Sequence, residues 1–129
     1  MIRVEVDNWE GVRNTVMERF VSSIADFDEI LNCLDGKKHT QLSTEFNDFY
    51  FVIGGNNDEF VVTKIYKDQR SFTLHKVDSI STYTHNICVG GQYGDFSDEI
   101  VVSRKETLCA AADVYFSDCK CQLQWIEDK

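Results

Sequence analysis

The sequence predicts an α+β fold, in which a single antiparallel β-sheet of about six to seven strands has two α-helices packed on it. Three observations favour this fold. Apolar and polar residues alternate through most of the chain, two segments instead repeat apolar residues at helical spacing, and the turns between strands are short. Because no repeat or linker interrupts the chain, residues 1–129 are expected to form one domain.

The N-terminal segment predicts a strand followed by a region of mixed character. Ile2, Val4 and Val6 alternate with charged residues, which is typical of a strand with one buried face. Residues 8–22 combine near-helical apolar spacing with a glycine and β-branched residues. We therefore expect loop and strand there.

The first helix is expected around Ile30, because apolar residues recur at helical spacing from Ile24 to Leu34. Its candidate N-terminal caps are Ser23 and Asp26, and a glutamate three residues after Asp26 fits a capping box. We expect the helix to end at Gly36.

From Thr40 onward the apolar pattern has the period of two that strands require. Turn-forming residues at 46–49, 54–58 and 67–70 separate the runs, and such short connections predict an antiparallel meander. The expected strands are Gln41 to Phe46, Phe49 to Ile53, Phe60 to Tyr66, Ser71 to Val77 and Thr82 to Val89.

The C-terminal third has the most informative order of elements. A glycine-rich acidic turn from Gly90 to Phe96 precedes a short apolar strand from Ile100 to Val102, a helix from Arg104 to Ser117 and a closing strand ending at Trp125. Trp125 is expected in the core, because large aromatic residues are usually well buried. One stripe of the helix carries residues that let it pack close to a sheet: Leu108, Ala111, Ala112 and Tyr115.

This C-terminal order resembles that of a large family of bacterial immunity proteins, which are encoded beside polymorphic toxins and occur most often with nucleic-acid deaminase toxins. The resemblance covers the C-terminal third, whereas the rest of the chain matches only in its rhythm of strands and helix. Family members commonly place Gly and Pro before the last strand, but this chain contains no proline. The residues that carry the resemblance are Gly90, Gly91, Gly94, Asp95, Phe96, Ile100 to Val102, Ala111, Ala112, Tyr115, Phe116 and Trp125.

The chain is strongly acidic, with 22 acidic and 13 basic residues and a formal net charge of −9. This charge disfavours nucleic acid or an anionic membrane as partner and favours a basic protein, although acidity also simply keeps small domains soluble. Five cysteines, an odd number, suit reduced thiols in a cytoplasm. Because the chain shows neither a signal-like N-terminus nor an apolar run of about 20 residues, we expect a cytoplasmic protein.

Motifs that could carry chemistry are weak. The glycine turn lacks a following lysine, and its acidic residues would repel a phosphate. His85 and Cys88, three residues apart on a predicted strand, point to opposite faces, and the pair Cys119 and Cys121 is a weak zinc signal by itself. No nucleophile motif lies beside the histidines. We therefore predict a protein that is not an enzyme and has no metal or cofactor.

The resemblance implies a protein that binds a cognate toxin domain, a deaminase or a nuclease, and blocks its active site. We expect such a toxin to be basic, and acidic and aromatic groups on turns are the candidate contacts, each with an ordinary solvated turn as the alternative. These candidates are Asp58, Glu59, Tyr93, Asp95, Asp98 and Glu99. Two other functions stay open: a small hydrolase or ligand-binding α+β domain whose pocket is lined by Tyr, His and Cys, and a subunit of a larger assembly.

Overall fold

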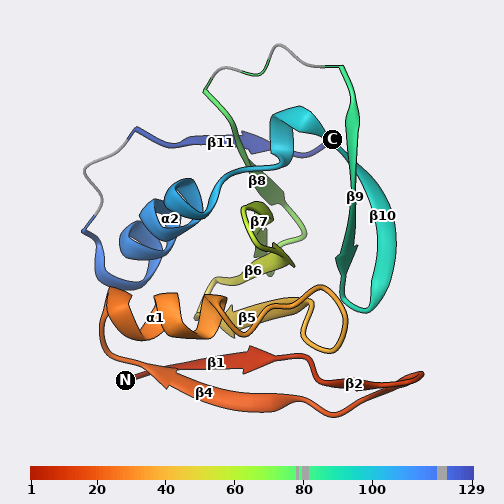
Figure 1. Ribbon diagram of the computed structural model, residues 1–129. Helices are drawn as coiled ribbons and strands as arrows, with labels where there is room; N and C mark the ends of the chain where they lie inside the picture. Colours follow the sequence, from red (N-terminus) through yellow and green to blue (C-terminus); the bar gives the residue numbers. More distant parts are fainter. Residues whose placement is uncertain (78, 80–81, 119–121) are drawn as a thin grey trace.

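The computed structural model describes residues 1–77, 79, 82–118 and 122–129, and within them the predicted α+β architecture is confirmed (Figure 1). The main antiparallel sheet has seven strands: β1 (Ile2–Val6), β4 (Met17–Val21), β5 (Gln41–Glu45), β6 (Phe49–Asn56), β7 (Glu59–Tyr66), β8 (Ser71–His75) and β11 (Gln124–Glu127). The other elements are the ribbon of β2 (Trp9–Glu10) and β3 (Arg13–Asn14), the hairpin of β9 (Thr84–Val89) and β10 (Gln92–Ser97), the 3-10 turn η1 (Asp98–Ile100), and the helices α1 (Ile24–Leu31) and α2 (Arg104–Phe116).

The order of the main sheet is β11-β8-β7-β6-β5-β1-β4. Strands β5 to β8 follow one another as the antiparallel meander that the short turns predict. The mixed region of residues 8–22 contains the small ribbon and then β4, which returns along β1. The N-terminal third therefore closes one edge of the sheet, and β11 closes the other.

Both helices cover the same face of the main sheet. Alternate residues such as Leu42, Phe51 and Val62 point to that face and are fully buried against the helices. Tyr115 of α2 lies at the centre, with its ring centroid 5.2 Å from that of Phe27 in α1 and 5.5 Å from that of Phe51. No helix in the described part of the chain is long and apolar enough to cross a membrane.

The hairpin of β9 and β10 forms a third layer on the opposite face (Figure 1). Gly54 of β6 points away from the helices, and a Cβ atom added there would lie 2.3 Å from Cγ1 of Val89. Only glycine at this position lets the hairpin pack so close to the sheet. The protein is thus built of helices, main sheet and hairpin in that order.

Three details differ from the sequence predictions. Helix α1 ends at Leu31 rather than at Gly36, because the Asp35 carboxylate accepts hydrogen bonds from the backbone amides of residues 37–39 and stabilises a turn instead. The expected strand from Ile100 to Val102 is not formed: Ile100 is the last residue of the 3-10 turn η1, and only Val102 pairs, in a single bridge with Phe60. Trp125 packs on the core but is only partly buried.

Asp7, at the end of β1, is a buried carboxylate with 8% of its surface exposed. Its oxygens accept hydrogen bonds from the backbone amides of Thr40 at 2.6 Å and Gln41 at 3.0 Å, and from Nε1 of Trp9 at 2.8 Å. The Thr40 hydroxyl is a fourth donor. Asp7 therefore joins the end of β1, the ribbon and the start of β5.

We predict that Asp7→Asn destabilises the protein by about 2–3 kcal/mol, because the amide would place a donor among groups that are all donors. Urea denaturation at pH 7 measures the change. Asp48→Asn, in an exposed turn, is the matched control and should change the free energy of unfolding by less than about 0.5 kcal/mol. Equal effects of the two substitutions would contradict a special role for Asp7.

Candidate functional site

The hairpin of β9 and β10 carries two of the six predicted contact residues, Tyr93 and Asp95, and η1 directly after it carries Asp98 and Glu99. Its turn consists of Gly90 and Gly91 with φ values of 62° and 80°. The expected turn from Gly90 to Phe96 is therefore too long, since Gln92 to Ser97 pair with Val89 to Thr84. Regular cross-strand pairing outweighs the weak strand propensities of glycine and aspartate in this segment.

The turn of the hairpin is attached to the main sheet through the Asp7 site. The backbone amide of Gly91 donates a hydrogen bond of 2.9 Å to the hydroxyl of Thr40, which itself donates to Asp7. A Cβ atom on Gly91 would lie 2.5 Å from the indole ring of Trp9, so the ring covers the turn directly. Both contacts hold this end of the hairpin in place.

The other end of the hairpin is attached through His85, on β9. Its Nε2 atom lies 2.7 Å from a carboxylate oxygen of Asp98, and its Nδ1 atom forms a short hydrogen bond with Glu59 at the start of β7. Asp98 also accepts hydrogen bonds from Nζ of Lys76 at 2.8 Å and from the hydroxyl of Ser79 at 2.9 Å. We call these five residues the His85 cluster.

Two carboxylates bound to one imidazole require both ring nitrogens to carry protons. The hydrogen bond with Asp98, and then that with Glu59, raise the pKa of His85 above its ordinary value, although partial burial opposes them. Hydrogen bonds from Lys76 and His85 hold the pKa of Asp98 well below its usual range. With both nitrogens occupied, His85 acts as a charged link between segments rather than as a general base in this arrangement.

The six predicted contact residues have different environments. Tyr93 and Asp95 are exposed on one face of β10, with 68% of Tyr93 accessible, and Glu99 is exposed on η1. Glu59 is exposed but bound to His85. We call Glu59, Tyr93, Asp95 and Glu99 the hairpin patch.

The other two predicted residues serve the fold. Asp98, expected as an exposed turn carboxylate, is 7% exposed and bound within the His85 cluster. Asp58 accepts a hydrogen bond of 2.8 Å from the backbone amide of Arg104, at the first turn of α2. A carboxylate there compensates the free amides of a helix N-terminus. Both are poor candidates for contacts with a partner.

Sequence reasoning missed the His85 cluster because its members come from separate elements. The sequence placed His85 on a predicted strand but indicated no partner for it, since Glu59 lies 26 residues before it and Asp98 lies 13 residues after it. No short spacing marks such a group. The acidic run at residues 98 and 99 was the available signal.

The histidines and cysteines considered as metal ligands or pocket residues lie in different parts of the structure. Among the described residues, no group of three or more His, Cys, Asp or Glu side chains could hold a metal ion. Cys119 and Cys121 lie outside the described residues. A hollow of about 270 Å³ beside β8, β11 and α2 is lined by His75 and Cys109 together with apolar, charged and amide side chains.

No family model matches this chain, and no curated protein matches it. The resemblance of the C-terminal third to immunity proteins therefore stays a prediction from the sequence.

We predict that His85→Gln lowers the free energy of unfolding by about 1–3 kcal/mol at pH 6, because it removes a charged donor between two carboxylates. The raised pKa of His85 means that its contribution is complete below about pH 6.5 and is lost as the pH rises through its folded-state pKa. The deficit of the variant should therefore shrink at pH 9. Urea denaturation at both pH values measures it.

His75→Gln, at a half-buried position of β8, is the matched control and should change stability by a similar amount at both pH values. A deficit of His85→Gln that is equal at pH 6 and pH 9 would show that the charge of His85 does not stabilise the fold.

Proposed function

We propose that this protein is an immunity protein, which binds a basic toxin domain acting on nucleic acid, a deaminase or a nuclease, and blocks its active site. The observation that carries the proposal is the hairpin patch. In it Tyr93 and Asp95 are exposed on a hairpin attached to the sheet at both ends, and Glu59 of β7 and Glu99 of η1 add further carboxylates. The resemblance of the C-terminal third and the net charge of −9 support it.

The chemistry of the hairpin patch suits a basic partner. An enzyme that acts on nucleic acid uses a positively charged groove for the phosphates, and an acidic protein is attracted to the same groove. Tyr93 offers a large ring with a polar end, the kind of side chain that often contributes most to an interface. Asp95 supplies charge two residues further along the same face of β10, and Glu99 supplies it on η1, beyond the end of the strand.

The attachment of the hairpin bears on affinity. Binding costs less entropy when the contacting segment is already ordered before the partner arrives. The His85 cluster and the Asp7 site hold the two ends of the hairpin, so Tyr93 and Asp95 are presented in one arrangement. This order is what a tight inhibitor needs.

We predict that co-expression with the protein encoded directly upstream yields a stable complex, and that the upstream protein alone kills cells. Failure of the pair to co-purify, or a harmless neighbour, would contradict the immunity proposal. A small molecule that raises the melting temperature of the free protein would instead favour the ligand-binding alternative.

Within such a complex, we predict that Asp95→Lys combined with Glu99→Lys weakens binding about tenfold or more and reduces its dependence on salt, because two exposed carboxylates are reversed. Calorimetry or surface plasmon resonance at two salt concentrations measures this. Glu29→Lys with Asp48→Lys makes the same charge change on α1 and in the β5 to β6 turn. Equal losses from both pairs would leave only a general charge effect and remove the hairpin patch as the contact.

A further inference from the structure

A second feature lies where strands β1 and β5 separate. Their ladder contains only the pairs Glu5 with Ser43 and Val6 with Leu42. The next two pairs in this register, Val4 with Thr44 and Arg3 with Glu45, are not formed, although β1 remains paired with β4 and β5 with β6 up to Glu45. Between the two strands the sheet therefore opens into a hollow of about 580 Å³, which we call the fork.

Hydrogen bonds of a buried threonine hydroxyl keep the two strands of the fork apart. The side chain of Thr44 is buried, and its hydroxyl donates a hydrogen bond of 3.0 Å to the backbone carbonyl of Arg3. In a regular ladder this carbonyl would instead accept a backbone hydrogen bond from β5. The same hydroxyl lies 2.8 Å from the hydroxyl of Tyr115 in the core. The hollow is thus part of the folded structure and needs no rearrangement to form.

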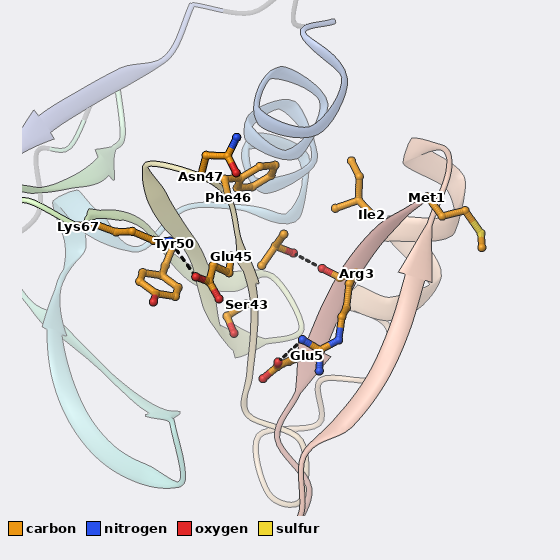
Figure 2. Close-up of a pocket in the computed structure, with 11 residues that line it drawn as sticks. Met1, Ile2, Arg3, Glu5, Ser43, Glu45, Phe46, Asn47, Tyr50 and Lys67 are labelled. Atoms are coloured by element: carbon orange, nitrogen blue, oxygen red, sulfur yellow. Dashed lines mark hydrogen bonds and ion pairs between the residues drawn. The ribbon is translucent and has the colours of Figure 1, made fainter.

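The walls of the fork are charged and its open end is apolar (Figure 2). Arg3 and Glu5 of β1 face Glu45 and Tyr50 of β5 and β6 across the gap, with Lys67 beside them. The apolar lining comes from Met1, Ile2 and Phe46. A ligand in the fork would therefore meet carboxylates, an aromatic ring and apolar surface together.

The two cations of the fork are already paired. Arg3 contacts Glu5 at 2.7 Å and also Glu18, and Nζ of Lys67 lies 2.8 Å from Glu45. These hydrogen bonds raise the pKa of Arg3, chiefly through Glu18, and lower the pKa of Glu45, chiefly through Lys67. Arg3 and Glu45 are therefore charged near neutral pH. Two carboxylates, Glu5 and Glu45, line the fork beside the two cations, and Glu18 contacts Arg3 from outside the lining.

The carboxylates of the fork keep free lone pairs beside the ion pairs they already form, and this favours a cationic ligand over an anionic one. An anion would have to displace a carboxylate from Arg3 or Lys67, in a protein whose net charge is −9. A cation can add to Glu5 and Glu45 without displacing anything, because one carboxylate accepts about four hydrogen bonds. The ring of Tyr50 already lies 5.4 Å from a cationic nitrogen, that of Lys67. The fork therefore suits a cation.

We propose that the fork is a binding site for an arginine side chain on the surface of a basic protein partner. The planar guanidinium has five donors to share between Glu5 and Glu45 and stacks on aromatic rings such as Tyr50. Its three methylene groups cover apolar surface at Ile2 and Phe46. The nature of the partner rests on the proposed function, whereas the site itself can be tested without any toxin.

The test is an NMR titration of the full ¹⁵N-labelled chain with N-acetyl-arginine amide, and with the neutral isostere N-acetyl-citrulline amide as the control ligand. We expect the arginine derivative to shift amide signals concentrated around Arg3, Ser43 and Glu45, and the citrulline derivative to leave them unchanged. Shifts spread evenly over acidic residues of the whole surface, or equal shifts with citrulline, would overturn the proposal.

Matched variants distinguish binding at the fork from a general effect of the protein's negative charge. Glu5→Gln with Glu45→Gln should weaken binding of the arginine derivative about fivefold or more, and Glu10→Gln with Glu29→Gln, which removes the same charge elsewhere, less than about twofold. Tyr50→Leu removes the aromatic ring but keeps an apolar side chain, and it should weaken binding about two- to threefold. This third variant keeps the test decisive if the double carboxylate variant fails to fold. Equal weakening by both glutamine pairs would overturn the proposal.

Spermidine is the last ligand to be tested, because a free polyamine is cationic like an arginine side chain. Spermidine should bind more weakly at the fork than the arginine derivative, since its ammonium groups lack the planar fork of donors. Tighter binding of spermidine at the same residues would assign the fork to free polyamines and overturn the assignment to a protein side chain. The immunity proposal would be unaffected by either result.

Discussion

The buried carboxylate of Asp7 is the interaction on which the arrangement of the layers depends. Burying a carboxylate is costly unless hydrogen bonds replace its water, and here four donors do so. They come from Trp9 in the ribbon and from Thr40 and Gln41 at the start of β5, so the carboxylate joins these two segments to the end of β1. Through Thr40 the same site reaches the turn of the hairpin at Gly91.

The hairpin is therefore part of the rigid body of the protein and not a loop attached to it. The Asp7 site holds its turn, Val89 packs over Gly54, and His85 joins its open end to the carboxylates of two other segments. The first attachment works through a buried anion and the last through a charged imidazole. Between them, the outer face of β10 is left exposed and ordered.

The hairpin patch and the fork present acidic groups in different ways. In the hairpin patch, Asp95 on β10 and Glu99 on η1 are exposed at the surface, where carboxylates act mainly through long-range attraction. In the fork, Glu5 and Glu45 line a hollow beside an aromatic ring and apolar side chains, where shape and charge select one kind of side chain together. A partner with a basic surface offers complementary groups to both.

Local patterns in the sequence determined the elements, because alternation and helical spacing report directly which residues of each segment face a core. On that basis the strand at Ile2 to Val6, the meander and both helices could be predicted. Only the tertiary structure decided which polar groups meet. Asp98 was expected at the surface yet is buried against Lys76 and His85, and the segment from Gln92 to Ser97 became a strand. The partners in these pairs are far apart in the chain, and local patterns carry no information about which distant segments pack together.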